Sequence, residues 1–132
     1  MATTNIFVNL QISDIAATRA FWTALGYTFN EDFCSDQSVA LELGPGISAM
    51  LLTPDHFGGF AVRPVTTDST EVIVALGVES REEVDRIADA ALAHGGAKAK
   101  DPMDEGWMYG RSFLDNDGHH WEVAYMDVSA LS

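Results

Sequence analysis

The chain is poor in cysteine and in basic residues. Cys34 is the one cysteine among 132 residues, so no disulfide can form within the chain. Seven Lys and Arg stand against twenty Asp and Glu, giving a formal net charge of −13. Nucleic-acid affinity comes largely from basic side chains that neutralise phosphates, so this balance argues against nucleic acid as a partner, and against an anionic membrane surface for the same reason. No apolar run reaches the ~18 residues of a membrane span.

The start of the chain also lacks the basic and apolar blocks of a signal peptide. Together these absences predict a cytoplasmic protein that handles a small molecule. Apolar residues make up 47% of the chain and charged residues 20%, which is typical of a globular protein and not of a disordered one.

Alternating and helical patterns follow each other in the first half of the chain. Residues 6–12 alternate with period two, as in a half-buried strand. Ser13 and Asp14 are good N-cap residues for a helix that runs to Leu25 and ends at Gly26. Strand-like runs follow at 27–33, 38–43 and 47–53, with a Gly-Pro-Gly turn at 44–46 between the last two and a short helical turn expected at 54–60.

The second half repeats this plan. Residues 71–78 alternate, and Ser80 with Glu83 forms a capping box in front of a helix that runs to about Ala93. Strands are expected at 97–101, 109–115 and 119–126. The chain therefore reads β-α-β-β-β twice, and an internal repeat of this kind is an informative organisational signal. We expect an α+β fold in which two tandem βαβββ modules, about 5–64 and 70–128, form an eight-stranded curved sheet around a cleft.

Two motifs resemble a known family. Residues 12–14 with the Phe-Trp-Thr-Ala-Leu-Gly-Tyr segment at 21–27 resemble the opening of the vicinal oxygen chelate superfamily, which contains glyoxalase I, bleomycin-resistance proteins and extradiol dioxygenases. Residues 113–123 resemble the closing hairpin of that superfamily, and 106–111 resemble a bacterial subgroup labelled lactoylglutathione lyase. The resemblance covers the whole chain. It implies a single glyoxalase/bleomycin-resistance domain over 1–132 and a homodimer.

The resemblance also implies where a metal would be held. Members with metal chemistry place four ligands, usually His, Gln or Glu, at positions that correspond here to Phe7, Met50, Ile73 and Glu122. Phe and Ile cannot coordinate a metal, and a thioether suits copper(I) rather than a hard divalent ion. His120 shares a strand face with Glu122, but two ligands do not make a site. We therefore expect no metal in the usual site, and no cofactor.

Strand alternation predicts which side chains line the cleft. The candidate catalytic residues are Glu122, a carboxylate among apolar neighbours that suits a general base, and His120, a candidate proton carrier. Both also have a purely structural interpretation, in which Glu122 is held by Arg111, His120 or a water. The expected ligand-binding residues are Phe7, Asn9, Gln11, Met50, Ile73, Trp107, Tyr109 and Arg111.

Trp107, Met108 and Tyr109 form a candidate lip that stacks on an aromatic ligand. Packing against the partner module or a second subunit is the alternative.

Three functions fit these residues. The first is a metal-free protein that binds and sequesters a small, partly aromatic compound, because the cleft is apolar and the metal ligands are missing. The second is a lyase or isomerase of the glyoxalase type with Glu122 as general base. The third is a non-catalytic scaffold domain. Whether the chain is an enzyme stays open at this stage, because a fold does not fix chemistry.

Overall fold

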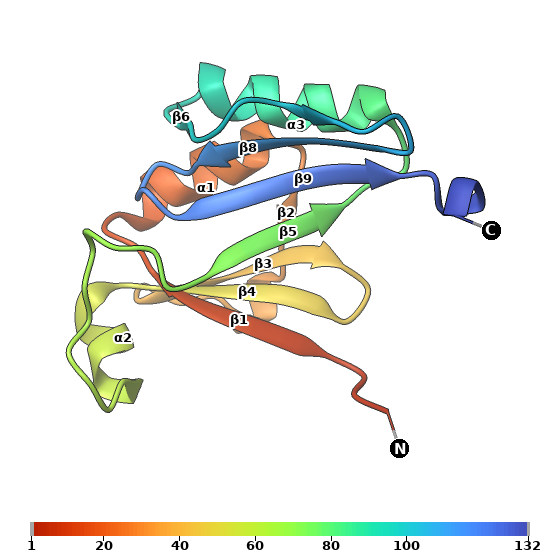
Figure 1. Ribbon diagram of the computed structural model, residues 1–132. Helices are drawn as coiled ribbons and strands as arrows, with labels where there is room; N and C mark the ends of the chain where they lie inside the picture. The colour runs from red at the N-terminus through yellow and green to blue at the C-terminus, as the bar shows by residue number, and fades with distance from the viewer. Residues whose placement is uncertain (1, 132) are drawn as a thin grey trace. The chain divides into compact units, whose positions relative to one another are not determined.

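The chain folds into two compact units, the first ending at Thr67 and the second beginning at Asp68. A computed structural model describes residues 2–131. The first unit contains, in chain order, β1 (Ile6–Gln11), α1 (Ile15–Ala24), β2 (Thr28–Phe29), a 3₁₀ turn (Glu31–Phe33), β3 (Ser38–Gly44), β4 (Ile47–Leu52) and α2 (Pro54–Phe60) (Figure 1). The second contains β5 (Ile73–Gly77), α3 (Arg81–Ala93), β6 (Ala97–Lys98), β7 (Met103–Asp104), β8 (Met108–Leu114), β9 (His120–Met126) and a 3₁₀ turn (Val128–Leu131).

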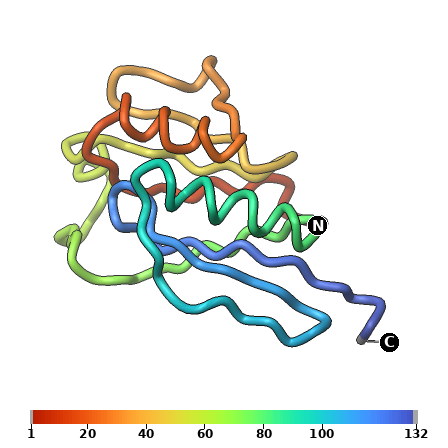
Figure 2. The backbone as a smooth tube through the Cα atoms, turned by 90° about the horizontal axis from the view of Figure 1, so that it is seen from above, coloured from red at the N-terminus to blue at the C-terminus, as the bar shows by residue number. Residues whose placement is uncertain are grey.

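One face of the first sheet is buried. The strands run in the order β1-β4-β3-β2, with β1 parallel to β4 and the other pairs antiparallel. Leu10, Leu41 and Leu51 point to the same face and are almost fully buried. Helix α1 contacts β3 and runs beside the strands of the first unit (Figure 2), and its large apolar side chains Phe21 and Trp22 are buried as well. The period-two pattern of the strands and the period-3.6 pattern of the helix thus meet in one core.

The second unit repeats the arrangement with one strand more. Its strands run in the order β5-β9-β8-β6. Strand β5 is parallel to β9, as β1 is to β4, and β7 pairs with β8 outside this order. Helix α3 contacts β8 and β9. The core between them is formed by Val84, Ile87, Ala88, Ala91, Phe113, Trp121 and Val123.

Side-chain caps begin both long helices, as the sequence predicts. The Asp14 carboxylate accepts a hydrogen bond from the Ala17 amide at 3.1 Å, and the Ser80 hydroxyl accepts one from the Glu83 amide at 3.1 Å. In a full capping box the Glu83 carboxylate would also accept a hydrogen bond from the Ser80 amide. Here that carboxylate instead binds the Arg86 guanidinium one turn further along α3. An ion pair at spacing i, i+3 competes well with a bond back to the helix start.

The α+β class is confirmed, with three corrections to the strands. The structure has sheets of four and five strands instead of eight strands in all. The run 27–33 forms strand only at 28–29, because the Asn30 side chain accepts from the Asp32 amide and turns the chain into a 3₁₀ helix. The run 97–101 ends as strand at Lys98; Pro102, which has no amide hydrogen, separates it from β7.

No helix within residues 2–131 is long and apolar enough to cross a membrane.

Candidate functional site

The face of the first sheet opposite α1 is open. Strand pairing places Thr28 beside Glu42, Glu42 beside Ser48, and Ser48 beside Phe7. Directly paired residues point to the same face, so these four side chains form one row across all four strands. A second row contains Ala40, Met50 and Asn9. Both rows point away from the buried face that carries Leu41 and Leu51.

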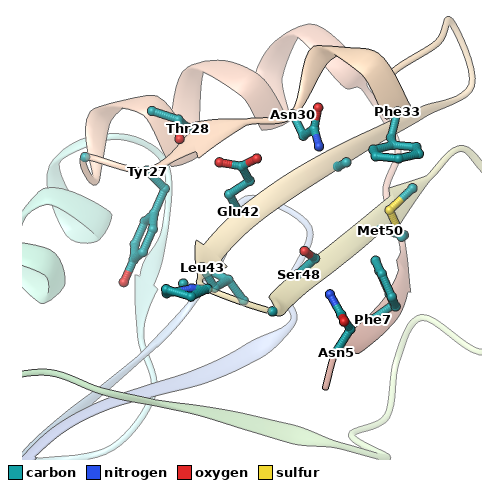
Figure 3. A pocket seen from close by; sticks show the side chains of 15 residues that line it. Asn5, Phe7, Tyr27, Thr28, Asn30, Phe33, Glu42, Leu43, Ser48 and Met50 are labelled. Carbon is teal, nitrogen blue, oxygen red and sulfur yellow. The ribbon is translucent and has the colours of Figure 1, made fainter. Parts of the chain in front are cut away.

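A pocket of about 960 Å³ lies on this open face. Figure 3 shows Phe7, Phe33 and Met50 at one end and Tyr27 at the other, with Glu42 and Ser48 between them. The remaining lining residues come from the ends of β1 and β2, from β3 and from the hairpin that joins β3 to β4: Asn5, Gly26, Thr28, Asn30, Ala40, Leu43, Gly44, Pro45 and Gly46. Three aromatic rings, one thioether and a few polar groups give it the composition of a small-molecule site.

The charged side chain that lines this pocket is negative. Glu42 is the acidic lining residue, and none of the described residues that line the pocket is Lys, Arg or His. The Glu42 carboxylate has no hydrogen-bond or ion-pair partner in the described part of the chain. Arg19, on α1, is instead bound to Glu31, with its two terminal nitrogens 2.8 and 2.9 Å from the carboxylate oxygens. The Arg19 guanidinium also lies over the ring of Phe29, on the other face of the sheet.

Two further predicted site residues lie next to this pocket on β1. The Asn9 side-chain amide donates to the Phe7 carbonyl at 3.2 Å, and Asn9 is exposed. Gln11 pairs with Leu52 and continues the same face by one more row.

The open face of the second sheet carries the two candidate catalytic residues. His120 pairs with Ile73, and Glu122 pairs with Ala75 on one side and Ser112 on the other. The His120 Nε2 atom is buried and has no hydrogen-bond partner among the residues the structure describes. Glu122 borders a recess of about 90 Å³ together with Lys100, Met103, Met108 and Ser112. The predicted pair thus shares one face, as strand alternation requires.

The side chains of Tyr109 and Arg111 bind helix α3 on the opposite face, although Arg111 is also among the residues that line the recess beside Glu122. The Tyr109 hydroxyl donates to Asp85 on α3 at 2.6 Å, and Arg111 binds Asp85 at 3.0 Å and Asp89 at 2.8 Å. Alternation explains the placement, because both share the parity of the core residue Phe113, whereas Ser112 shares that of Glu122. Trp107 stands just before β8, half-buried, and its carbonyl accepts from the Asp127 amide at 2.7 Å.

The contacts of Tyr109 shift the ionisation of its neighbours. The hydrogen bond from Tyr109, followed by that from Arg111, lowers the pKa of Asp85. In return the Asp85 carboxylate raises the pKa of Tyr109. The Arg81 guanidinium lies 5.0 Å from the centre of the Tyr109 ring and binds Asp104, lowering the pKa of Asp104 to about 2. This network ties α3 to β7 and β8.

The four positions that the resemblance assigns to metal ligands do not provide a metal site of the usual kind. In the first sheet they are Phe7 and Met50, and in the second Ile73 and Glu122. This set offers one hard donor, the Glu122 carboxylate, where a divalent ion needs three or four. Within residues 2–131, no three His, Cys, Asp or Glu side chains are grouped so that they could hold a metal ion.

Some pocket residues were not singled out from the sequence. The position of Glu42 could have been predicted from strand alternation. Val39 and Leu41 are the apolar residues of this strand, so Ala40 and Glu42 point to the open face. Tyr27 belongs to the Leu-Gly-Tyr segment that ends α1. Phe33 lies in the 3₁₀ turn, where no periodicity indicates a direction for its side chain.

The observed architecture defines a class of α+β proteins built from two βαβββ units. The family description that matches residues 6–123 is the Glyoxalase/Bleomycin resistance protein/Dioxygenase superfamily. The chain belongs to this superfamily. No curated protein matches it.

Several solved structures share the fold. A hypothetical protein from S. aureus is similar at 29% identity, with 95% of each chain covered and a TM-score of 0.81. A glyoxalase-related enzyme from Fulvimarina pelagi has 20% identity, covers 92% of this chain and 87% of its own, and has a TM-score of 0.80. A lactoylglutathione lyase from Agrobacterium tumefaciens has 15% identity, 96% coverage of both chains and a TM-score of 0.68. At 20% identity and below, these likenesses show the fold alone.

Proposed function

We propose that this protein binds and sequesters a small, partly aromatic molecule in the pocket of the first sheet, without a metal ion. The pocket itself is the observation that carries the proposal. Its volume of about 960 Å³ is at the upper end of the range for small-molecule sites, which is about 300–1,000 Å³. At the positions where relatives with metal chemistry hold ligands, this pocket has Phe7 and Met50, which offer apolar contact.

The exposure of the pocket side chains supports the same proposal. Phe7 is 57% exposed and Phe33 is 66% exposed. Large apolar side chains that stay exposed around a concave surface gain free energy when a ligand removes them from water, about 25 cal/mol per Å² buried. A flat aromatic ligand would cover both rings. We further propose that the protein acts in the cytoplasm, where a lone free cysteine such as Cys34 stays reduced.

Calorimetric titration with naphthylmethanol, a neutral aromatic probe, tests the proposal. We expect saturable binding with one site per chain. Phe7→Ala removes one wall of the pocket and should weaken binding roughly tenfold, the size of effect expected for a buried aromatic contact. Phe60→Ala is the matched control, because Phe60 is 71% exposed in the same unit and does not line the pocket. Absence of saturable binding, for this probe and for a broad aromatic panel, would contradict the proposal.

A second candidate function is supported by Glu122. Its carboxylate has no hydrogen-bond or ion-pair partner in the described part of the chain, and it borders the recess near Lys100 and Ser112. A carboxylate that is not already engaged can remove a proton from a carbon next to a carbonyl group, the step that a lyase or isomerase of the glyoxalase type requires. Turnover of hemithioacetals that disappears in Glu122→Gln would establish this candidate. Lack of turnover in the unmodified protein, with or without added divalent metal, would remove it.

A further inference from the structure

The pocket of the first sheet contains a negative charge that nothing described in the chain neutralises. We infer that this pocket selects organic cations, namely an ammonium or amidinium group attached to a flat apolar body, and that Glu42 is the residue that recognises the charge. This inference rests on the proposed function and adds the chemical class of the ligand.

Glu42 is exposed to solvent, and its carboxylate stands between the Tyr27 end and the Phe7 end of the pocket (Figure 3). It stands in the row of the open face between Thr28 and Ser48, whose hydroxyl side chains are short and uncharged. Figure 3 shows its carboxylate rising from β3 towards the segment that carries Thr28 and Asn30. A ligand lying along the floor would therefore pass over this carboxylate. A neutral or anionic ligand would remove water from the charge without replacing it, which is unfavourable.

The aromatic side chains around Glu42 suit the same kind of ligand. Tyr27 lies at one end of the pocket, and Phe7 and Phe33 lie at the other (Figure 3). A cation held near aromatic faces is attracted by the ring quadrupoles, and an aromatic body stacks on the rings. The carboxylate and the rings therefore favour a cationic ligand together.

The fold does not require a carboxylate at position 42. Glu42 pairs with Ser48 in the first unit, and Leu114 pairs with His120 in the second. Both residues of the second pair lie 72 positions after those of the first, so the two pairs are equivalent in the repeat. The corresponding residue in the second unit is thus Leu114. A leucine serves the same strand position there, so the glutamate is a feature of this pocket and not of the βαβββ unit. The net charge of −13 acts in the same direction, because it attracts cations and repels anions.

Three probes of the same shape separate the charge from the apolar contact. Naphthylmethylamine is cationic at neutral pH, naphthylmethanol is neutral and naphthoate is anionic. Calorimetric titration at neutral pH and low salt should show the amine binding about tenfold or more tightly than the alcohol, with naphthoate weakest. Equal affinity for the amine and the alcohol would overturn the inference while leaving the proposed function intact. Absence of binding by all three would overturn both.

Substitution of Glu42 identifies the residue responsible. Glu42→Gln keeps the size of the side chain and removes its charge. It should weaken binding of the amine until the amine and the alcohol bind equally, and it should not weaken binding of the alcohol, because the alcohol no longer covers a charge. Asp36→Asn, in the same unit but outside the pocket, changes the net charge equally and should preserve the selectivity. Selectivity that survives Glu42→Gln would contradict the assignment. Circular dichroism checks that both variants are folded.

Discussion

Tyr109 receives a carboxylate on its hydroxyl group and a guanidinium over its ring. The hydrogen bond to Asp85, at 2.6 Å, stabilises the protonated phenol, so its pKa lies above the ordinary value of about 10. We predict that Tyr109→Phe removes a tyrosine ionisation that lies above the ordinary pKa, measured by ultraviolet absorbance during a titration with base. Asp85→Asn should lower the pKa of Tyr109, because it removes the negative charge beside the hydroxyl group.

Asp89→Asn is the control for this titration. It removes the other carboxylate that binds Arg111 and leaves the bond between Tyr109 and Asp85 in place. A Tyr109 pKa that stays the same in Asp85→Asn, or that falls equally in Asp89→Asn, would contradict the account of this network.

The same bond has a consequence for stability in acid. The pKa of Asp85 is lower in the folded chain than its ordinary value near 4, because the charged form accepts from Tyr109 and Arg111. The stabilisation is therefore present above that ordinary value and is lost as the pH falls through the lowered pKa. Asp104 behaves in the same way, because the bond from Arg81 lowers its pKa to about 2. The stabilisation from the Arg81–Asp104 ion pair is therefore lost as the pH falls from about 4 to about 2.

At the scale of elements, the two repeated hairpins differ at their glycines. Gly46, between β3 and β4, has φ +71°, and Gly118, between β8 and β9, has φ +82°. Both therefore adopt a conformation that disfavours a side chain. A Cβ at Gly46 would in addition collide with the Thr4 carbonyl, whereas nothing lies within 4 Å of one at Gly118.

We therefore predict unequal costs for the same substitution in the two hairpins. Gly118→Ala should lower the free energy of unfolding by about 1 kcal/mol, because only the backbone conformation is strained. Gly46→Ala should lower it by roughly 2–3 kcal/mol, because the N-terminal segment before β1 must also move. Urea denaturation followed by circular dichroism measures both values. A Gly46→Ala variant as stable as Gly118→Ala would show that this segment is not held against the turn.

The elements were predictable from the sequence wherever a local pattern determined them. Alternation in residues 6–12 and the caps at Asp14 and Ser80 correspond to β1, α1 and α3, and the repeat was readable from its spacing. The 3₁₀ turn and β7 were not predictable in this way, because each follows from one side-chain contact or one proline. Within the site, the placement of Phe7 and Met50 on the open face required only strand parity. That of Phe33 depends on how a loop folds back, which periodicity does not report.

For the whole molecule, we predict a homodimer. The first strand of each unit, β1 and β5, is the outermost strand of its sheet, and each exposes an isoleucine: Ile6 is 56% and Ile73 is 48% exposed. Apolar side chains on a free strand edge are typical of an association surface. Sedimentation equilibrium should therefore give twice the chain mass of 14.3 kDa.

Ile73→Lys should shift this equilibrium towards the single chain, since it places a charge on the strand edge. Val62→Lys, at a position that is 97% exposed outside the strands, should not. A mass of 14.3 kDa for the unmodified protein, over a wide concentration range, would refute the dimer.

The most direct test of the account is the metal dependence of ligand binding. Naphthylmethylamine is titrated into the same protein preparation in excess chelator, and again after loading with nickel, zinc or iron that mass spectrometry has quantified. Because Phe7, Met50 and Ile73 occupy the positions of metal ligands, we expect the same dissociation constant in every titration and no stoichiometric metal on the protein. Binding that disappears in chelator, together with one equivalent of metal that is lost in Glu122→Ala, would contradict it.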